Sequence, residues 1–148
     1  MPEQETLERA RHDKEEGKSP STQAGEFVRE EMHHIREGKH GARSTKQAIA
    51  IGLSKARRAG VKLSPPRKGT VSAGTRRSAE RAYEKGQTGS RIRPSRTRSR
   101  ATLNALRKEG HSAASPSSLS RQAKSAARKR SPGERSSAAR KAARTRMH

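Results

Sequence analysis

The chain has 148 residues with a formal net charge of +22, because 36 Lys and Arg residues face only 14 Asp and Glu residues. Just 26% of the residues are hydrophobic, and 18 large apolar side chains are too few to offset the chain entropy of a domain this long. With a mean hydropathy of -1.24, this composition predicts disorder over most of the chain. The absence of cysteine excludes disulfides, zinc-cysteine sites and thiol nucleophiles.

No apolar stretch reaches the length of a signal peptide or a membrane span, so we expect a cytoplasmic protein. Charge is distributed unevenly. Residues 1–37 carry ten acidic and six basic side chains, whereas residues 38–148 carry 30 basic and four acidic ones. This pattern predicts an acidic disordered tail at 1–21, with a frayed helix as the alternative, and a basic low-complexity tail at 65–148. A polyanion is the partner that such a basic segment favours.

Between these tails, residues 22–64 have the pattern of a helix hairpin. Ala24, Val28, Met32 and Ile35 share one stripe at helical spacing, and Gly38 suits the helix end. A second helix is predicted from a capping box, in which Ser44 accepts from the amide of Gln47 and the Gln47 side chain reaches back.

The second helix is expected to run to about Ala59, with Gly60 as the left-handed residue of a Schellman ending. Its apolar face, which includes Leu53, should pack on the first helix. Ile51 lies about 160° from the centre of that face. Two interpretations of Ile51 stay open: partial cover by a neighbouring segment such as 61–63, or a face for self-association or a protein partner.

The basic tail shows only weak helical patterns. A Ser-Ala-Ala-Arg-Lys sequence at 125–129 recurs at 137–141, and Ser131 with Glu134 forms a second capping box. Isolated basic helices are marginal in water because like charges repel and nothing apolar packs them. The expected fold class is therefore all-α, with a small hairpin at about 24–63 and a largely disordered, weakly helical basic C-terminal tail.

Candidate catalytic and metal-binding groups are sparse. His33, His34 and His40 fit no standard zinc spacing, so we expect solvated histidines and no metal site. Glu30, Glu31 and Glu37 look like partners of nearby bases on the helix surface. No nucleophile triad, phosphate-cradling glycine loop or dinucleotide fingerprint occurs, so the sequence predicts neither an enzyme nor a cofactor.

For nucleic acid the signals are mutually consistent. Arg outnumbers Lys by 24 to 12, which favours bidentate phosphate contacts, and the single Phe and Tyr argue against base-stacking platforms. The segment at 64–68 resembles the Ser-Pro-basic units of linker-histone tails, and residues 125–145 resemble the tails of bacterial histone-like proteins. The predicted phosphate-binding residues are Lys46, Lys55, Arg57, Arg58, Arg67, Lys68, Arg91, Arg93, Arg96, Arg98, Arg100, Arg128, Lys129, Arg130, Arg140, Lys141 and Arg144.

The hairpin also resembles a small uncharacterised bacterial domain of unknown function. The resemblance covers about 27–60 and centres on the stretch Lys46-Gln-Ala-Ile-Ala-Ile51. Two positions depart from the pattern: Gly52 replaces an alanine, and Thr45 stands where arginine is common. The resemblance implies a bacterial cytoplasmic protein and carries no catalytic or binding residues with it.

We therefore expect a nucleoid-associated or accessory protein that binds duplex DNA through phosphates. The loop at 38–43 is longer than a helix-turn-helix turn, so we expect little sequence specificity. The acidic N-terminal segment is expected to shield the basic tail when no nucleic acid is bound. Two alternatives stay open: an RNA- or ribosome-associated protein, and an adaptor that docks a protein partner through Ile51.

Overall fold

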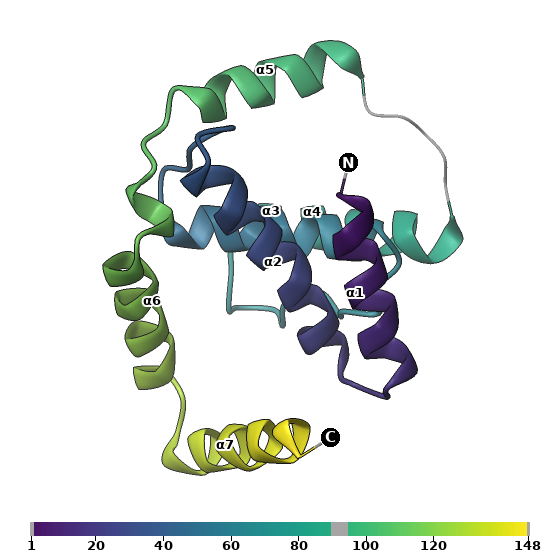
Figure 1. Cartoon of the computed structure of the whole chain (residues 1–148), viewed down its shortest axis with the longest axis vertical. Helices are drawn as coiled ribbons and strands as arrows, with labels where there is room; N and C mark the ends of the chain where they lie inside the picture. Colours follow the sequence, from purple (N-terminus) through teal and green to yellow (C-terminus); the bar gives the residue numbers. More distant parts are fainter. Residues whose placement is uncertain (1, 90–94, 148) are drawn as a thin grey trace.

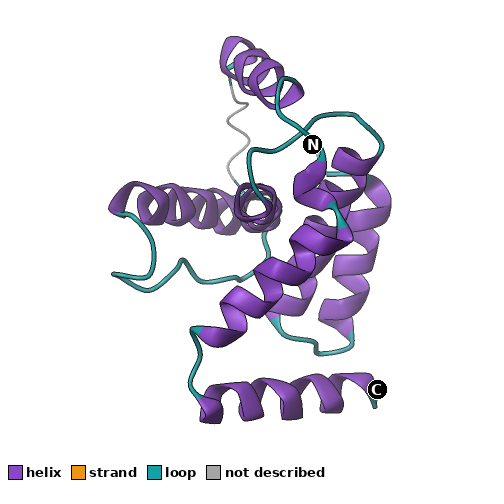
Figure 2. Cartoon of the chain, turned by 90° about the vertical axis from the view of Figure 1, so that its left-hand side faces the viewer, coloured by secondary structure: helices purple, strands orange, loops and turns teal. Residues whose placement is uncertain are grey.

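The computed structural model describes residues 2–89 and 95–147, and within these residues the regular structure is helical (Figures 1 and 2). Helices α1 to α4 form the centre of the molecule. Helices α5, α6 and α7 follow one another along its outside, from the top of Figure 1 past the left edge to the bottom. The elements are α1 (Gln4–Glu15), α2 (Pro20–Arg36), α3 (Thr45–Arg58), α4 (Ala73–Thr88), α5 (Arg96–Arg107), the 3-10 turn η1 (Ser112–Ala114), α6 (Pro116–Arg128) and α7 (Pro132–Arg146).

The predicted pair of helices is present as α2 and α3, which pack against each other. Helix α2 begins earlier than expected, at Pro20, because Ser19 caps it and proline fits the first helical position. At the start of α3 the Ser44 Oγ accepts from the Gln47 amide at 3.1 Å, as predicted. The Gln47 side chain reaches back to the amide of Arg43 at 2.7 Å, one residue before the predicted position.

Both helices of the pair end in the way that their glycines predict. Gly38 and Gly60 have φ of 78° and 98°, a region that favours glycine. After α3, the amide of Val61 donates to the Ala56 carbonyl and that of Gly60 to the Arg57 carbonyl, both at 3.1 Å. These two bonds make the Schellman motif and turn the chain sharply away from the helix.

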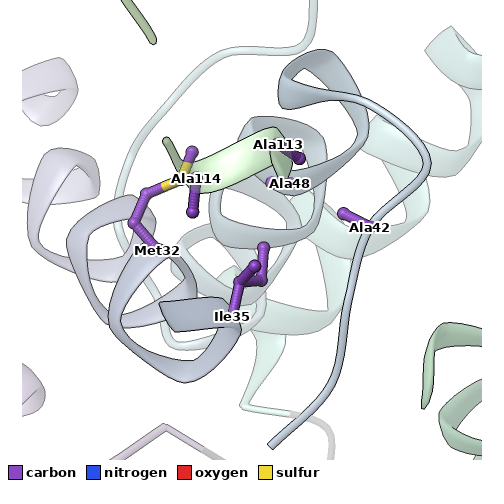
Figure 3. Packing of buried hydrophobic residues seen from close by; sticks show 6 residues of the cluster. All are labelled: Met32, Ile35, Ala42, Ala48, Ala113 and Ala114. Atoms are coloured by element: carbon purple, nitrogen blue, oxygen red, sulfur yellow. The ribbon is translucent and has the colours of Figure 1, made fainter. Parts of the chain in front are cut away.

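One buried cluster joins α2 and α3 to the C-terminal region. Met32 and Ile35 of α2, Ala42 of the loop and Ala48 of α3 surround Ala113 and Ala114 of η1 (Figure 3). Ala114 is completely buried. Hydrogen bonds fix the same contact, since Thr45 Oγ1 donates to the Ala113 carbonyl at 2.7 Å and Arg36 Nε donates to the Ala114 carbonyl at 3.0 Å.

This packing corrects the expectation of a largely disordered basic tail. Helix α4 packs on α3, with Ala79 and Ala82 buried, and a Cβ on Gly86 would collide with the Arg57 carbonyl oxygen. Farther on, the amide of Gly41 donates to the Leu106 carbonyl at 2.8 Å. Counting large apolar residues does not predict that this region packs, because alanine and glycine let helices approach closely. Such helices bury backbone as well as small side chains.

The acidic N-terminal segment is likewise helical where a disordered tail was expected. A second buried cluster consists of Ala10 of α1, Ala24 and Phe27 of α2, and Ala56 and Val61 at the end of α3. Thr6 of α1 is completely buried too. Helix α1 is therefore held by the apolar side of the hairpin and is part of the folded core.

Ile51 is half-buried. Among the described residues, the exposed large apolar side chains are Val71, Leu103 and Met147, which lie far apart in the sequence. A protein-docking role for Ile51 stays a prediction. Within the same described residues, no helix combines the length and the apolar character that crossing a membrane requires.

Candidate nucleic-acid interface

The acidic side chains of the N-terminal half are largely matched by bases of the same half. Arg9 pairs with Glu5 and lies 2.7 Å from Glu26, and Lys18 Nζ lies 2.9 Å from the Asp13 carboxylate. Within the described residues, the ion pairs join groups between positions 3 and 80. None of these pairs joins an acidic group of the N-terminal segment to a base of the tail at 65–148, so the expected shielding of the tail is not seen among the described residues. The positive charge of α5–α7 is therefore not neutralised by these pairs.

Two predicted phosphate-binding residues have structural contacts instead. Lys55 pairs with Glu31, whose side chain is only 1% exposed. Arg57 is 6% exposed and donates to the carbonyls of Leu63 and Ser64, both at 3.1 Å. Burial lowers the pKa of Arg57, but an arginine keeps its charge at neutral pH. These residues fasten α3 to α2 and to the following loop, and their contacts are within the fold.

Lys46 lies at the rim of a shallow groove between the start of α3 and α6. The groove has a volume of about 340 Å³ and is also lined by Arg121 of α6, together with Ser44, Thr45, Ser118, Gln122 and Ser125. The helix dipole adds partial positive charge at the start of α3, on this side. Lys46 was predicted from the sequence; Arg121 was not, since only the packing of α6 on α3 brings it there.

Other predicted bases in the first half are exposed without forming one surface with the groove. Arg58 is exposed near the end of α3, where its Nε makes a long contact of 3.4 Å with the Ser54 carbonyl. Arg67 and Lys68 are exposed in the loop before α4. The Arg67 carbonyl accepts from the amide and the hydroxyl of Thr70, which forms a tight turn there.

Helices α5 to α7 hold the densest set of bases. Residues 95–147 contain 15 Lys and Arg residues against two Glu residues. The predicted members are all exposed: Arg96, Arg98, Arg100, Arg128, Lys129, Arg130, Arg140, Lys141 and Arg144. Arg91 and Arg93 lie outside the described residues.

Helical geometry sorts these bases into stripes that the sequence alone did not indicate. In α5, Arg96 and Arg100 share a side and Arg98 points away from them, so the expected arginine ladder is divided between two faces. In α6, Arg121, Lys124 and Arg128 follow the i, i+3, i+7 spacing of one face. A helix over 118–130 is predicted from the sequence, but Lys124 was not among the predicted phosphate-binding residues, which in this segment were taken from the run of adjacent bases.

A separate cluster of histidines and carboxylates lies on α2 and the loop after it. Of the three histidines expected to be solvated, only His33 is exposed; the side chains of His34 and His40 are 13% and 8% exposed. His40 contacts the Gly41 carbonyl through Nδ1 at 2.9 Å and Glu31 Oε2 through Nε2 at 3.1 Å. This cluster links the loop to α2 and lies outside the basic stripes.

Comparison with known proteins gives one match. Residues 14–68 match the model of a family described as "Family of unknown function (DUF6496)", which spans the end of α1, α2, α3 and the loop before α4. The match supports the resemblance of the hairpin to an uncharacterised domain, and it does not extend to α4–α7. No curated protein and no solved structure matches the chain.

Proposed function

We propose that this protein is a non-catalytic nucleic-acid-binding protein that holds duplex DNA through its phosphates with little sequence specificity. The observation that carries the proposal is the separation of charge in the fold. Most acidic groups of the first 80 residues are paired with bases, whereas residues 95–147, which include α5–α7, contain 15 bases against two acids. A cellular role in or near the nucleoid follows from this proposal.

The arrangement suits a phosphate backbone for physical reasons. Like charges at helical spacing repel one another, so a bound polyanion stabilises the helices that carry them. Helix α7, with 15 residues, is about 22 Å long and can follow several successive phosphates. Arginine predominates, and its planar guanidinium binds phosphate oxygens in pairs.

Several features disfavour reading of base sequence. Helix α3, the second helix of the hairpin, has α4 and α6 packed against it, and its Gln47 side chain is occupied by the cap. A recognition helix needs several free side chains at its start to reach base edges. Contacts from Lys46 and Arg121 are therefore proposed to go to phosphates.

The proposal predicts a steep salt dependence. The logarithm of the association constant for a duplex of about 30 base pairs should fall linearly with the logarithm of salt concentration. The slope should be about 0.9 per phosphate contact, with several contacts made at once. Fluorescence anisotropy with labelled duplex between low and physiological salt measures it. A flat dependence would contradict phosphate binding, and stronger competition by RNA than by DNA would favour the RNA-associated alternative.

A further inference from the structure

A carboxylate on α2 is buried with one oxygen that has no hydrogen-bond partner among the described residues. The side chain of Glu30 is 2% exposed, and this oxygen is its Oε2. Its Oε1 accepts from the backbone amide of Glu3 at 3.2 Å. A carboxyl oxygen that is withdrawn from water without a partner is costly, so this carboxyl group can accept a further cation or donor.

The groups nearest to Glu30 are those that bind metal ions. His34 lies one helical turn further along α2, on the same face, and its Nε2 is 3.7 Å from Glu30 Oε1. Glu3 Oε1, from the start of the chain, lies 2.9 Å from the same nitrogen. These three residues can bring one ligand atom each to within 4.8 Å of the others.

The distances suit a tetrahedral ion. Zinc binds imidazole nitrogen and carboxylate oxygen at about 2.0–2.2 Å, which places neighbouring ligand atoms about 3.3 Å apart. His34 Nε2 lies 2.9 Å from Glu3 Oε1 and 3.7 Å from Glu30 Oε1, and these two separations bracket that value. The charge also fits, because the two carboxylates have one lysine nearby, Lys39, 3.3 Å from Glu3 Oε1.

From these observations we propose that Glu3, Glu30 and His34 form a binding site for a divalent transition-metal ion of the zinc class. Glu30 and His34 supply a rigid pair of ligands from α2, and Glu3, half-exposed, closes the site from the chain before α1. An imidazole ligand favours zinc, nickel or cobalt over magnesium and calcium, which take oxygen ligands. Such an ion would join the N-terminus to α2 and stabilise the packing of α1.

Titration of the full-length chain with ZnCl₂ in an isothermal calorimeter tests the site. One ion per chain should bind, and at an excess of about a hundredfold over Kd the thermal unfolding midpoint should rise by several degrees. His34→Gln and Glu3→Gln should each lose most of the affinity and of the shift. Glu3 is half-exposed, so its variant keeps the test valid if His34→Gln disturbs the fold.

His33→Gln is the matched control, since His33 is exposed and is the neighbour of His34 on the same helix. It should bind zinc as the unchanged chain does. Absence of saturable binding would overturn the proposal. So would equal zinc affinity in His34→Gln, because the ion would then be held by another group, such as the exposed His12 with Asp13 and Glu16.

Discussion

Replacing Ala114 by aspartate is expected to unfold most of the protein. Ala114 is completely buried between α2 and α3, so a carboxylate there would lose its water. Arg36, which contacts this residue, already donates its Nε to the Ala114 carbonyl. Burial of an unpaired charge costs several kcal/mol, a large part of the total stability of about 5–15 kcal/mol that is usual for a domain. Circular dichroism during thermal unfolding should show a midpoint lowered by well over ten degrees.

Ser112→Asp is the control for this change, because Ser112 is exposed in the same 3-10 turn and the substitution adds the same charge. Its unfolding midpoint should lie within a few degrees of the unchanged chain. Equal stability of the two variants would mean that η1 does not pack in the core, and the C-terminal region would then be a tail after all.

Neutralising three bases of α7 is expected to weaken DNA binding strongly. In Arg140→Gln/Lys141→Gln/Arg144→Gln the salt slope should fall by about 2.7, because each lost phosphate contact removes about 0.9. At physiological salt the Kd for a duplex should rise by about tenfold or more. No residue of α7 is buried in the structure, so the unfolding midpoint should stay unchanged.

The matched variant removes the same charge from the N-terminal helices α1 and α2, which lie outside the basic segment α5–α7. Arg11, Lys14 and Arg29 are exposed bases of α1 and α2, and their replacement by glutamine also lowers the net charge by three. Affinity should change by less than about threefold, because long-range attraction is screened within about 10 Å. If the two triple variants lose equal affinity, net charge alone governs binding and α7 is not a specific contact surface.

The parts of the fold that could be predicted from sequence are those with a local cause. Neighbours within a few positions predict the helix cap at Ser44, the helix ends at Gly38 and Gly60, and the apolar stripe of α2. Gly52 stands where the family pattern has alanine. A Cβ there would lie 2.7 Å from the Cα of Val28, so the glycine permits the close approach of α3 to α2.

The parts that could not be predicted depend on contacts between distant segments. Ala113 and Ala114 join the core because the chain returns from α5 to the α2–α3 loop, and no local pattern marks them. Contacts between distant segments also explain why Lys55 was wrongly assigned to the candidate interface and why Arg121 was not predicted to belong to it. The partner of Lys55 lies on another helix, and Arg121 reaches the groove only through the packing of α6.

The central claim is that a folded protein binds DNA through its outer basic helices, α5–α7. The most direct test is amide hydrogen exchange of the full chain, with and without duplex DNA. In the free protein, amides of α3, α4 and η1 should exchange slowly, since these elements pack on one another or on the core. Added DNA should slow exchange in α5–α7 and at the start of α3, and leave α1 and α2 unchanged. Rapid exchange from residue 73 onward in the free protein, or protection by DNA centred on α1 and α2, would contradict it.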